Sequence, residues 1–406
     1  SNMIKRKKKT SSEDEYSIEI LSEDLFENED GSMDKQAKKK FVLKRWHKAV
    51  IAAFLVVIIL AGSLTGGVFY LRARGEKNLK TEVPETAEQA PAEKREGLYV
   101  TYNGKEYKYN ENIINFLCLG IDKDVPIDEE RQGGIEGFAD AILLVSVDVE
   151  DGVVQLLAIP RDSIVPVKVM DSDGNLSRNE NVQITMQYAY GRTAEESCEL
   201  MTDAVSNLLF KLPIQRYCSI NFEAVPTLND AIGGVDVDVL EDVFGDHCTL
   251  YAGTTVHLDG YEALDYIRWR DEWVAESSMG RLERQKQYML NYFNQAKDTL
   301  KEDITLPVKV FQELDGNMCT NVTVEDLTYL APEMLDIAMD TENIAMVPGE
   351  VVQGEKLEEY HINEDELKEL VISRFYEEVT PEPDAAENKT ENNVSETEDT
   401  AAAAEE

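Results

Sequence analysis

The sequence contains little of what most metal, redox and nucleic-acid sites are built from. Its five cysteines show no CxxC spacing and are odd in number, so neither a disulfide framework nor a zinc site is expected. Its four histidines are scattered, which gives no support to a histidine-based metal site or catalytic triad. Basic residues are half as frequent as acidic ones, 40 against 80, for a formal charge of −40. Nucleic-acid-binding domains normally carry a net basic surface, so no nucleic-acid partner is expected.

One segment lacks charge altogether. Residues 49–71 read AVIAAFLVVIILAGSLTGGVFYL, and about 20 apolar residues suffice for a helix to span a bilayer. Few buried helices of soluble proteins lack charge over such a length, and the segment begins too late for a cleaved signal peptide. The flanking basic residues are Lys35, Lys38, Lys39, Lys40, Lys44, Arg45 and Lys48 before it, and Arg72, Arg74, Lys77 and Lys80 after it. The uncharged run predicts a single transmembrane helix. The larger number of basic residues before it than after it predicts that the N-terminus is cytoplasmic.

The remaining composition divides the chain. Residues 1–48 alternate basic and acidic blocks with little apolar content and are predicted to be a disordered cytoplasmic segment. Residues 72–97 lack aromatic side chains and read as a flexible linker. The tail, residues 379–406, is acidic and also predicted to be disordered. The folded unit is therefore residues 98–378, on the outer side of the cell membrane.

Short apolar runs bounded by turn residues predict buried strands at 115–121, 141–147 and 153–159. The tight connection DVEDG between the second and third predicts an antiparallel hairpin. Helical spacing predicts helices at 194–211, 281–300 and 324–338. The expected fold class is α/β, with a central mainly antiparallel or mixed sheet packed with helices, on the single N-terminal transmembrane helix.

Three charged residues flank the predicted strands. Asp122 follows the first strand, Asp140 precedes the second, and Arg161 follows the third. In an antiparallel meander all three would meet at one edge of the sheet, beside a long connection of the kind that is often functional. Two carboxylates and a guanidinium suit a divalent cation with a phosphate. On spacing alone, the carboxylates could equally cap turns while Arg161 pairs with Asp162.

A second cluster lies between residues 256 and 285. Arg268 and Arg270 would share a face in an extended segment, and Arg281 and Gln285 would share a helix face, with Arg284 beside them. Gly280 gives backbone freedom before that helix, whose N-terminal N–H groups favour an anion. This pattern predicts an anion site. The alternative is a solvated, salt-bridged face, because the acidic residues Asp265, Asp271, Glu272 and Glu276 are near in sequence.

The ordered set of motifs resembles the LytR-CpsA-Psr family of cell-wall glycopolymer transferases over about residues 113–350. The motifs are NFLCLGID, FADAILLVSVD, LLAIPRDS, YAYG, LNDAIGGVDVDV, LDGYEALDYIRWR and GRLERQ. The resemblance implies a phosphotransferase that moves a glycopolymer, such as teichoic acid or capsular polysaccharide, from a polyprenyl diphosphate carrier to peptidoglycan as a phosphodiester. The implied partners are the lipid-linked glycan, peptidoglycan and membrane lipid.

The resemblance also implies roles for single residues. Asp122 and Asp140 match the acidic residues on the metal side, where Mg²⁺ (or Mn²⁺) would bind, and Arg161 matches the arginine of the IPRD motif. The diphosphate would be held by Arg161, Arg268, Arg270, Arg281 and Gln285, and the catalytic set is Asp122, Asp140 and Arg161. The chain departs from the family at Ser278, where the family often has Asp, at Gln183-Ile184-Thr185 in place of Lys-Ile-Asn, and at Arg192 in place of Gly.

Two alternative functions share the same residues. One is a regulator of wall synthesis that binds lipid diphosphate without turnover, and the other is a pyrophosphatase that uses water in place of a sugar hydroxyl. Transcriptional regulation is not expected of a domain outside the membrane that carries no basic DNA-reading helix.

The charge asymmetry around residues 49–71 makes the topology testable. A reporter that functions only outside the cytoplasm, fused to the C-terminus, is expected to be active, because the basic flank holds the N-terminus inside. A cytoplasmic reporter at the same position serves as the control. Activity of that control together with silence of the first reporter would refute this topology.

Overall fold

The structure, a computed structural model, describes residues 66–84, 87–89, 92–122, 137–271, 277–314, 316–337, 339–354 and 357–379. The predicted segment 1–48, most of the predicted span 49–71 and the tail beyond 379 lie outside these ranges. Within them, no helix combines the length and the apolar character needed to cross a membrane. Every element below belongs to the compact unit that starts at Leu71.

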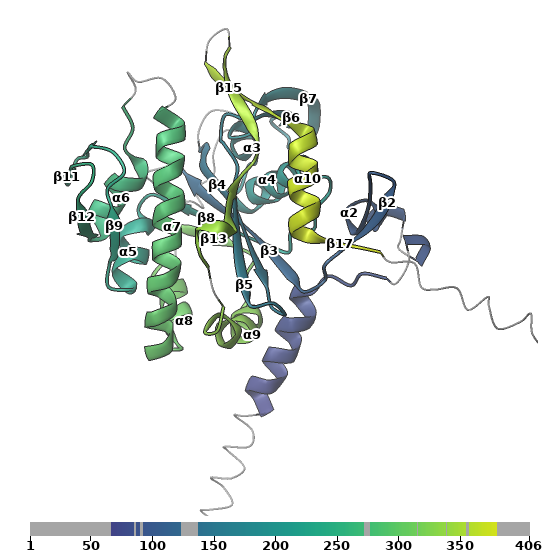
Figure 1. The fold of residues 1–406 in the computed structure, drawn as a ribbon, viewed down its shortest axis with the longest axis horizontal. Coiled ribbons are helices and arrows are strands. Elements are labelled where there is room, and N and C mark those ends of the chain that lie inside the picture. The colour runs from purple at the N-terminus through teal and green to yellow at the C-terminus, as the bar shows by residue number, and fades with distance from the viewer. Residues whose placement is uncertain are drawn as a thin grey trace, which may run out of the picture. The chain divides into compact units, whose positions relative to one another are not determined.

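A six-stranded mixed sheet forms the centre of the fold (Figure 1). The predicted meander is confirmed: β3 (Ile113–Ile121), β4 (Ala139–Asp148) and β5 (Val153–Ala158) pair antiparallel in sequence order. The sheet order is β13-β8-β3-β4-β5-β14. β8 (Arg216–Asn221) is parallel to β3, β13 (Met318–Thr320) is antiparallel to β8, and β14 (Ile344–Met346) is parallel to β5. The α/β fold class with a mixed central sheet is therefore as expected.

The end of β3 is irregular where the site begins. The pairing of β3 with β4 shifts register between Gly120 and Ile121, and a side chain at Gly120 would meet the Ala141 Cβ at 3.0 Å. Bulges of this kind terminate pairing and redirect the neighbouring side chains. The irregularity stands directly before Asp122 and opposite Asp140, so it shapes the sheet edge on which the candidate site is built.

Helices cover both faces of the sheet (Figure 1). On one face, α4 (Ala194–Leu208) and α10 (Glu364–Phe375) contribute to the largest apolar cluster, together with α3 (Met186–Ala189). On the other, α7 (Ser277–Glu302) packs its apolar side chains against β4 and β5. α4 and α7 confirm two predicted helices. The third, α9 (Val324–Met334), begins where predicted, behind the capping box of Thr323 and Asp326, but ends four residues early.

The smaller elements surround this core. α5 (Ala224–Ala231), α6 (Gly260–Arg268) and α8 (Leu306–Glu313) lie on the α7 side. The short strands are β1 (Tyr99–Tyr102), β2 (Lys105–Tyr109), β6 (Ile164–Met170), β7 (Leu176–Gln183), β9 (Val235–Asp238), β10 (Val243–Phe244), β11 (Thr249–Leu250), β12 (Thr255–Leu258), β15 (Gly349–Gln353), β16 (Glu358–Ile362) and β17 (Tyr376–Glu378). They pair as β1-β2-β17, β6-β7, β9-β12, β10-β11 and β15-β16.

The predicted linker differs from a flexible spacer over its first part. Residues 71–79 are helical, and Leu79 is fully buried in a cluster with Ile114, Tyr329 and Leu330. A further helix, α2 (Ala92–Leu98), leads into β1. The composition suggested a spacer because the segment is mostly polar, but its few large apolar side chains are enough to dock it on the domain.

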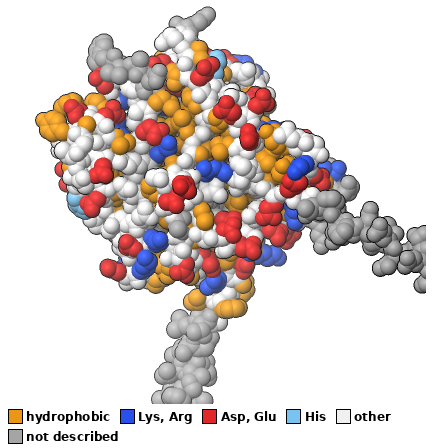
Figure 2. Space-filling view, in the orientation of Figure 1, with side chains coloured by type: hydrophobic (Ala, Val, Ile, Leu, Met, Phe, Trp, Pro, Cys, Tyr) orange, Lys and Arg blue, Asp and Glu red, His pale blue; other side chains and the backbone are white. Residues whose placement is uncertain are grey.

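In the part of the chain that the structure describes, the acidic side chains are spread over the surface and do not form one patch. On the face drawn in Figure 2, carboxylates are spread among apolar and neutral side chains, and basic side chains occur singly or in small groups. Among the described residues on this face there is no continuous basic band. The arginines discussed below are concentrated in a cavity instead.

A buried ion pair ties β8 to α9. Asp326 is fully buried and accepts from Arg216 at two points, Nε to Oδ2 at 2.7 Å and Nη2 to Oδ1 at 3.2 Å. It also accepts from the backbone N–H of Thr323 at 2.9 Å. Breaking a buried pair leaves an uncompensated charge, which is strongly destabilising.

We expect Asp326→Asn to lower the free energy of unfolding by about 3–5 kcal/mol. Urea denaturation followed by circular dichroism measures this. Glu180→Gln, which removes a carboxylate from the exposed pair with Arg178, is the matched control and should change stability by less than about 1 kcal/mol. Equal losses in the two variants would contradict the account of the buried pair.

Candidate functional site

The three predicted edge residues meet in one polar cavity. Asp122, Asp140 and Arg161 line a cavity of about 440 Å³ at the edge of the sheet where β3 ends and β4 begins. Arg268, Arg270 and Arg281 line the same cavity. The two clusters that the sequence suggested separately therefore form one site, because α6 and α7 pack beside this edge of the sheet.

Asp140 lies at the centre of the charged groups. Its Oδ1 pairs with Arg161 and its Oδ2 is 3.3 Å from Nη1 of Arg281. Arg161 also lies 3.4 Å, Nε to Oδ1, from Asp162. The alternative in which Arg161 pairs with its neighbour thus describes part of its contacts. The other part is the bond to Asp140, and this makes Arg161 and Arg281 converge on one carboxylate.

Arg281 is buried beside other cations. It is 6 % exposed, and burial lowers the pKa of its guanidinium. Asp140 opposes this shift, and the nearby charges of Arg161 and Arg270 reinforce it. Four arginines and four aspartates line the polar cavity, so its formal charges balance. Guanidinium groups that converge where water screens charge poorly can still bind a phosphate through two parallel N–H groups.

The segment that carries Arg268 and Arg270 is not extended as predicted. Arg268 is the last residue of α6, and the chain leaves the helix at Trp269. The expectation failed because the capping box of Asp259 and Glu262 starts a helix that runs through Arg268. Both arginines still line the polar cavity. Nη2 of Arg268 is 3.8 Å from Oδ1 of Asp122.

Gly280 and Arg284 also differ from expectation. Gly280 lies inside the first turn of α7 and not before the helix. Arg284 is fully buried and donates to the backbone carbonyls of Tyr266, at 2.9 Å, and Trp269. It pairs with Glu241 as well. Arg284 therefore holds the end of α6 in place, and it belongs neither to a solvated face nor to the polar cavity.

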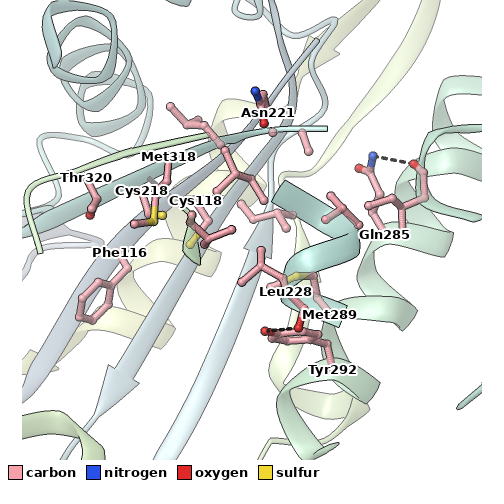
Figure 3. A pocket seen from close by; sticks show the side chains of 18 of the residues that line it. Phe116, Cys118, Cys218, Asn221, Leu228, Gln285, Met289, Tyr292, Met318 and Thr320 are labelled. Carbon is pink, nitrogen blue, oxygen red and sulfur yellow. Dashed lines mark hydrogen bonds between the residues drawn. The ribbon is translucent and has the colours of Figure 1, made fainter. Parts of the chain in front are cut away.

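Gln285 lies beside the charged residues of the site: it lines a small pocket together with Asp140, Arg161 and Arg281. Its amide donates to the carbonyl of Ile267 at 3.2 Å, and its side chain lines an apolar cavity (Figure 3). It does not line the polar cavity. Through this bond Gln285 supports the last turn of α6.

The apolar cavity lies between the sheet and helices α5, α7, α8 and α9. Its volume is about 410 Å³. Figure 3 shows Phe116, Cys118, Cys218 and Met318 from the strands facing Leu228, Met289 and Tyr292 from the helices. Burial raises the pKa of the Cys118 thiol to about 12, so it is an apolar lining group rather than a reactive thiolate.

The two cavities share a wall. Asp140, Phe222, Arg268 and Arg281 line both. The guanidinium carbon of Arg268 stands 4.5 Å from the centre of the Phe222 ring, a cation–π contact that orients the arginine at this boundary. A long apolar chamber thus adjoins a chamber of converging arginines, and the arrangement fits a molecule with an apolar tail and an anionic head.

Sequence reasoning missed Phe222 and saw Asp265 only as an acidic neighbour of the arginines. Phe222 supports Arg268, and Asp265 accepts from the backbone N–H groups of His247, at 2.6 Å, and Cys248, at 3.0 Å. The latter contacts hold the loop between β10 and β11 at the rim of the polar cavity. No spacing in the sequence links these residues, since they approach only through the packing of α6.

The departures from the family pattern have structural consequences. Gln183 donates to Asp162 at 3.1 Å and to the carbonyl of Glu358 at 2.8 Å, so it fixes the partner of Arg161. Arg192 pairs with Glu196 at 3.0 Å on the surface, outside the cavities. Ser278 is the second residue of α7.

The acidic residues suit a metal only in combination with a ligand. Among the residues that the structure describes, no three His, Cys, Asp or Glu side chains form a metal-binding group. Asp122 and Asp140 line the same cavity, and Mg²⁺ characteristically takes one or two carboxylates together with substrate phosphates and water. The donor set therefore fits Mg²⁺ or Mn²⁺ as a partner of a bound diphosphate.

Comparisons with known proteins agree with this geometry. The sequence model of the LytR_cpsA_psr family matches residues 73–373. The Bacillus subtilis (strain 168) protein TagU, named a polyisoprenyl-teichoic acid–peptidoglycan teichoic acid transferase, is 24% identical over 280 residues, which are 69% of this chain and 80% of that protein.

Two solved structures share the fold. The crystal structure of B. subtilis TagV covers 65% of this chain and 97% of its own, with a TM-score of 0.50 and 22% identity. The crystal structure of gbs0355 from Streptococcus agalactiae covers 64% and 87%, with a TM-score of 0.51 and 20% identity. At this level of identity the likeness concerns the fold alone.

Proposed function

This chain belongs to the LytR-CpsA-Psr family, and on that premise we propose that it is a phosphotransferase of cell-wall assembly. It moves a glycopolymer, such as teichoic acid, capsular or other wall polysaccharide, from a polyprenyl diphosphate carrier to peptidoglycan. The relative TagU is named for the corresponding transfer of teichoic acid. The domain acts on the outer side of the cell membrane, anchored by the span predicted at residues 49–71.

The observation that carries this proposal is the pair of adjoining cavities. The apolar cavity of about 410 Å³ suits part of a polyprenyl chain, and the polar cavity of about 440 Å³ suits the diphosphate and the first sugars. Arg268 and Arg281 line both cavities, where the apolar tail of the carrier would meet its charged head. Arginine binds phosphate through two parallel N–H groups, which fixes orientation as well as charge.

The transfer requires one bond to form and one to break at phosphorus. The oxygen of a hydroxyl on peptidoglycan attacks the phosphorus that carries the glycan, and the bond from that phosphorus to the bridging oxygen breaks. Polyprenyl monophosphate leaves, and the hydroxyl proton passes to a base. The diphosphate repels an incoming oxygen until its charge is neutralised, and the arginines of the polar cavity supply that neutralisation.

The two carboxylates suit different tasks. Both oxygens of Asp140 are engaged by Arg161 and Arg281, so it positions these guanidinium groups, and each oxygen keeps a second lone pair for a cation. The side chain of Asp122 is 48% exposed, and its distance to Arg268 is 3.8 Å. Asp122 is thus the carboxylate better suited to accept the proton of the acceptor hydroxyl. Mg²⁺ or Mn²⁺, held by Asp122 and Asp140 together with the diphosphate, would add further charge neutralisation.

Arg161→Lys tests the transfer. Lysine keeps the charge but cannot make the bidentate contact, so we expect transfer of glycan to peptidoglycan to fall by about 100-fold or more, with little change in thermal stability. The assay follows radiolabelled glycan from a polyprenyl diphosphate carrier into insoluble peptidoglycan. Arg178→Lys on the exposed surface of β7 is the matched control.

The same assay separates the alternative functions. Release of free glycan phosphate without attachment would indicate a pyrophosphatase, and tight carrier binding without either product would indicate a binding regulator. Full transfer by Arg161→Lys, with the fold intact, would contradict the role given to this arginine.

Mg²⁺ and a polyprenyl diphosphate are expected to bind cooperatively to the purified protein, because each supplies ligands to the other. Linkage requires each to tighten the other by the same factor, typically about 5- to 150-fold. Calorimetric titration of the lipid with and without Mg²⁺ measures the coupling.

Asp122→Asn is expected to abolish this coupling while binding of the apolar tail persists. Asp140→Asn should do the same, but it also leaves the buried Arg281 with fewer partners, so its stability must be measured in parallel. Asp236→Asn, at an exposed position on β9, is the control. Wild-type coupling in both site variants would rule out a metal at these carboxylates.

A further inference from the structure

The outer side of helix α8 carries an apolar stripe. Ile304, Val308 and Phe311 are exposed by 51 %, 41 % and 37 %. Val308 and Phe311 lie three residues apart on one face of α8, and Ile304 lies in the turn just before the helix. α8 contains no buried residue at all. Its apolar side chains are thus partly exposed to water, which is unfavourable unless another surface covers them.

The inner side of α8 closes the apolar cavity. Val310, Phe311 and Leu314 line that cavity, with Leu327 and Leu330 of α9 beside them. Phe311 both lines the cavity and is exposed. It therefore stands at the opening of the cavity, between the interior and the apolar stripe on the surface.

The chain enters the domain beside this opening. Arg72 pairs with Glu333 near the end of α9, and Arg74 Nη1 lies 3.9 Å from Oε1 of Glu325 near its start. A side chain at Gly75 would meet the carbonyl oxygen of Glu325 at 2.0 Å, so the backbones are in close contact. In Figure 1, residues 71–79, α8 and α9 gather at one end of the domain, and β7 and β15 lie at the other.

We infer that the stripe of Ile304, Val308 and Phe311 rests on the outer surface of the lipid bilayer, so that the polyprenyl chain enters the apolar cavity beside α8 without crossing water. The inference rests on the proposed function and topology. The uncharged segment 49–71 ends where residues 71–79 begin to pack on α9, so a membrane-anchored domain has this end within reach of the bilayer. Lys301 and Lys309 beside this face are paired with Asp298 and Asp303, so the interfacial contact rests on the exposed apolar side chains and not on basic charge.

Tryptophan quenching in vesicles tests the contact. The full chain is reconstituted in phosphatidylcholine vesicles with and without bromine on the acyl chains, as the parent protein, as Val308→Trp and as Leu176→Trp. Leu176 is 55 % exposed on β7, at the opposite end of the domain. The native tryptophans, three in all, are subtracted as the parent signal. We expect bromine to quench the added tryptophan at 308 and not at 176. Equal signals at the two positions would overturn the inference.

A second measurement tests lipid entry. The double variant Ile304→Ser/Val308→Ser changes two residues that do not line the cavity. Transfer from a long-chain carrier in the bilayer should fall by at least about tenfold, because apolar contact area is lost. Transfer from a short, water-soluble carrier should not change. Equal effects on the two carriers would overturn the entry role. The quenching experiment requires no transfer, so it decides the membrane contact even if the proposed function fails.

Discussion

An arginine that is removed from water must be given partners for its charge and for its N–H groups, and helix α7 carries two such residues one turn apart. Arg281 is bound to Asp140 at the sheet edge, and Arg284 is bound to the backbone at the end of α6. Their burial joins three elements that are distant in sequence: the edge of the central sheet, the end of α6 and the start of α7. The site depends on this junction, because Arg161, Arg268 and Arg270 are placed by the elements that it fixes.

The junction also divides the site into two chambers of opposite character. On one side of Arg268 and Arg281 the walls are aliphatic, aromatic and sulfur-containing side chains, and on the other they are guanidinium and carboxylate groups. An amphipathic lipid with an anionic head matches both chambers at once, since neither its tail nor its head has to be exposed to the wrong surroundings. The net charge of the chain is strongly negative, so a cavity lined by four arginines is a local property that the overall composition does not reveal.

The position of the N-terminal helical residues links this site to the proposed membrane anchor. Residues 71–79 pack against α9, and α9 lines the apolar cavity together with α8. The N-terminal helical residues and the apolar chamber thus contact the same helix, α9.

Much of this protein followed from its sequence by local rules. Apolar runs bounded by turn residues located β3, β4 and β5, and the short DVEDG connection established their antiparallel order. That order alone brought Asp122, Asp140 and Arg161 to one edge of the sheet. In a meander each strand starts at the edge where the previous strand ends, so β3 ends, β4 begins and β5 ends at the same edge. The uncharged run at 49–71 and its basic flank led to the topology prediction, and the chain of motifs pointed to the family that the family match then established.

Tertiary packing decided the rest. It made Arg284 a buried support and Gln285 a lining residue of the apolar cavity, although both share the helix that carries Arg281, because a turn of helix aims neighbouring side chains at different surroundings. It placed Arg268 at the end of α6 and not in an extended segment. It also brought Phe222 to Arg268, although no sequence spacing links these two residues. Local sequence fixes periodicity and turns over a few residues, whereas the partner of a buried charge is determined only when elements far apart in the chain come into contact.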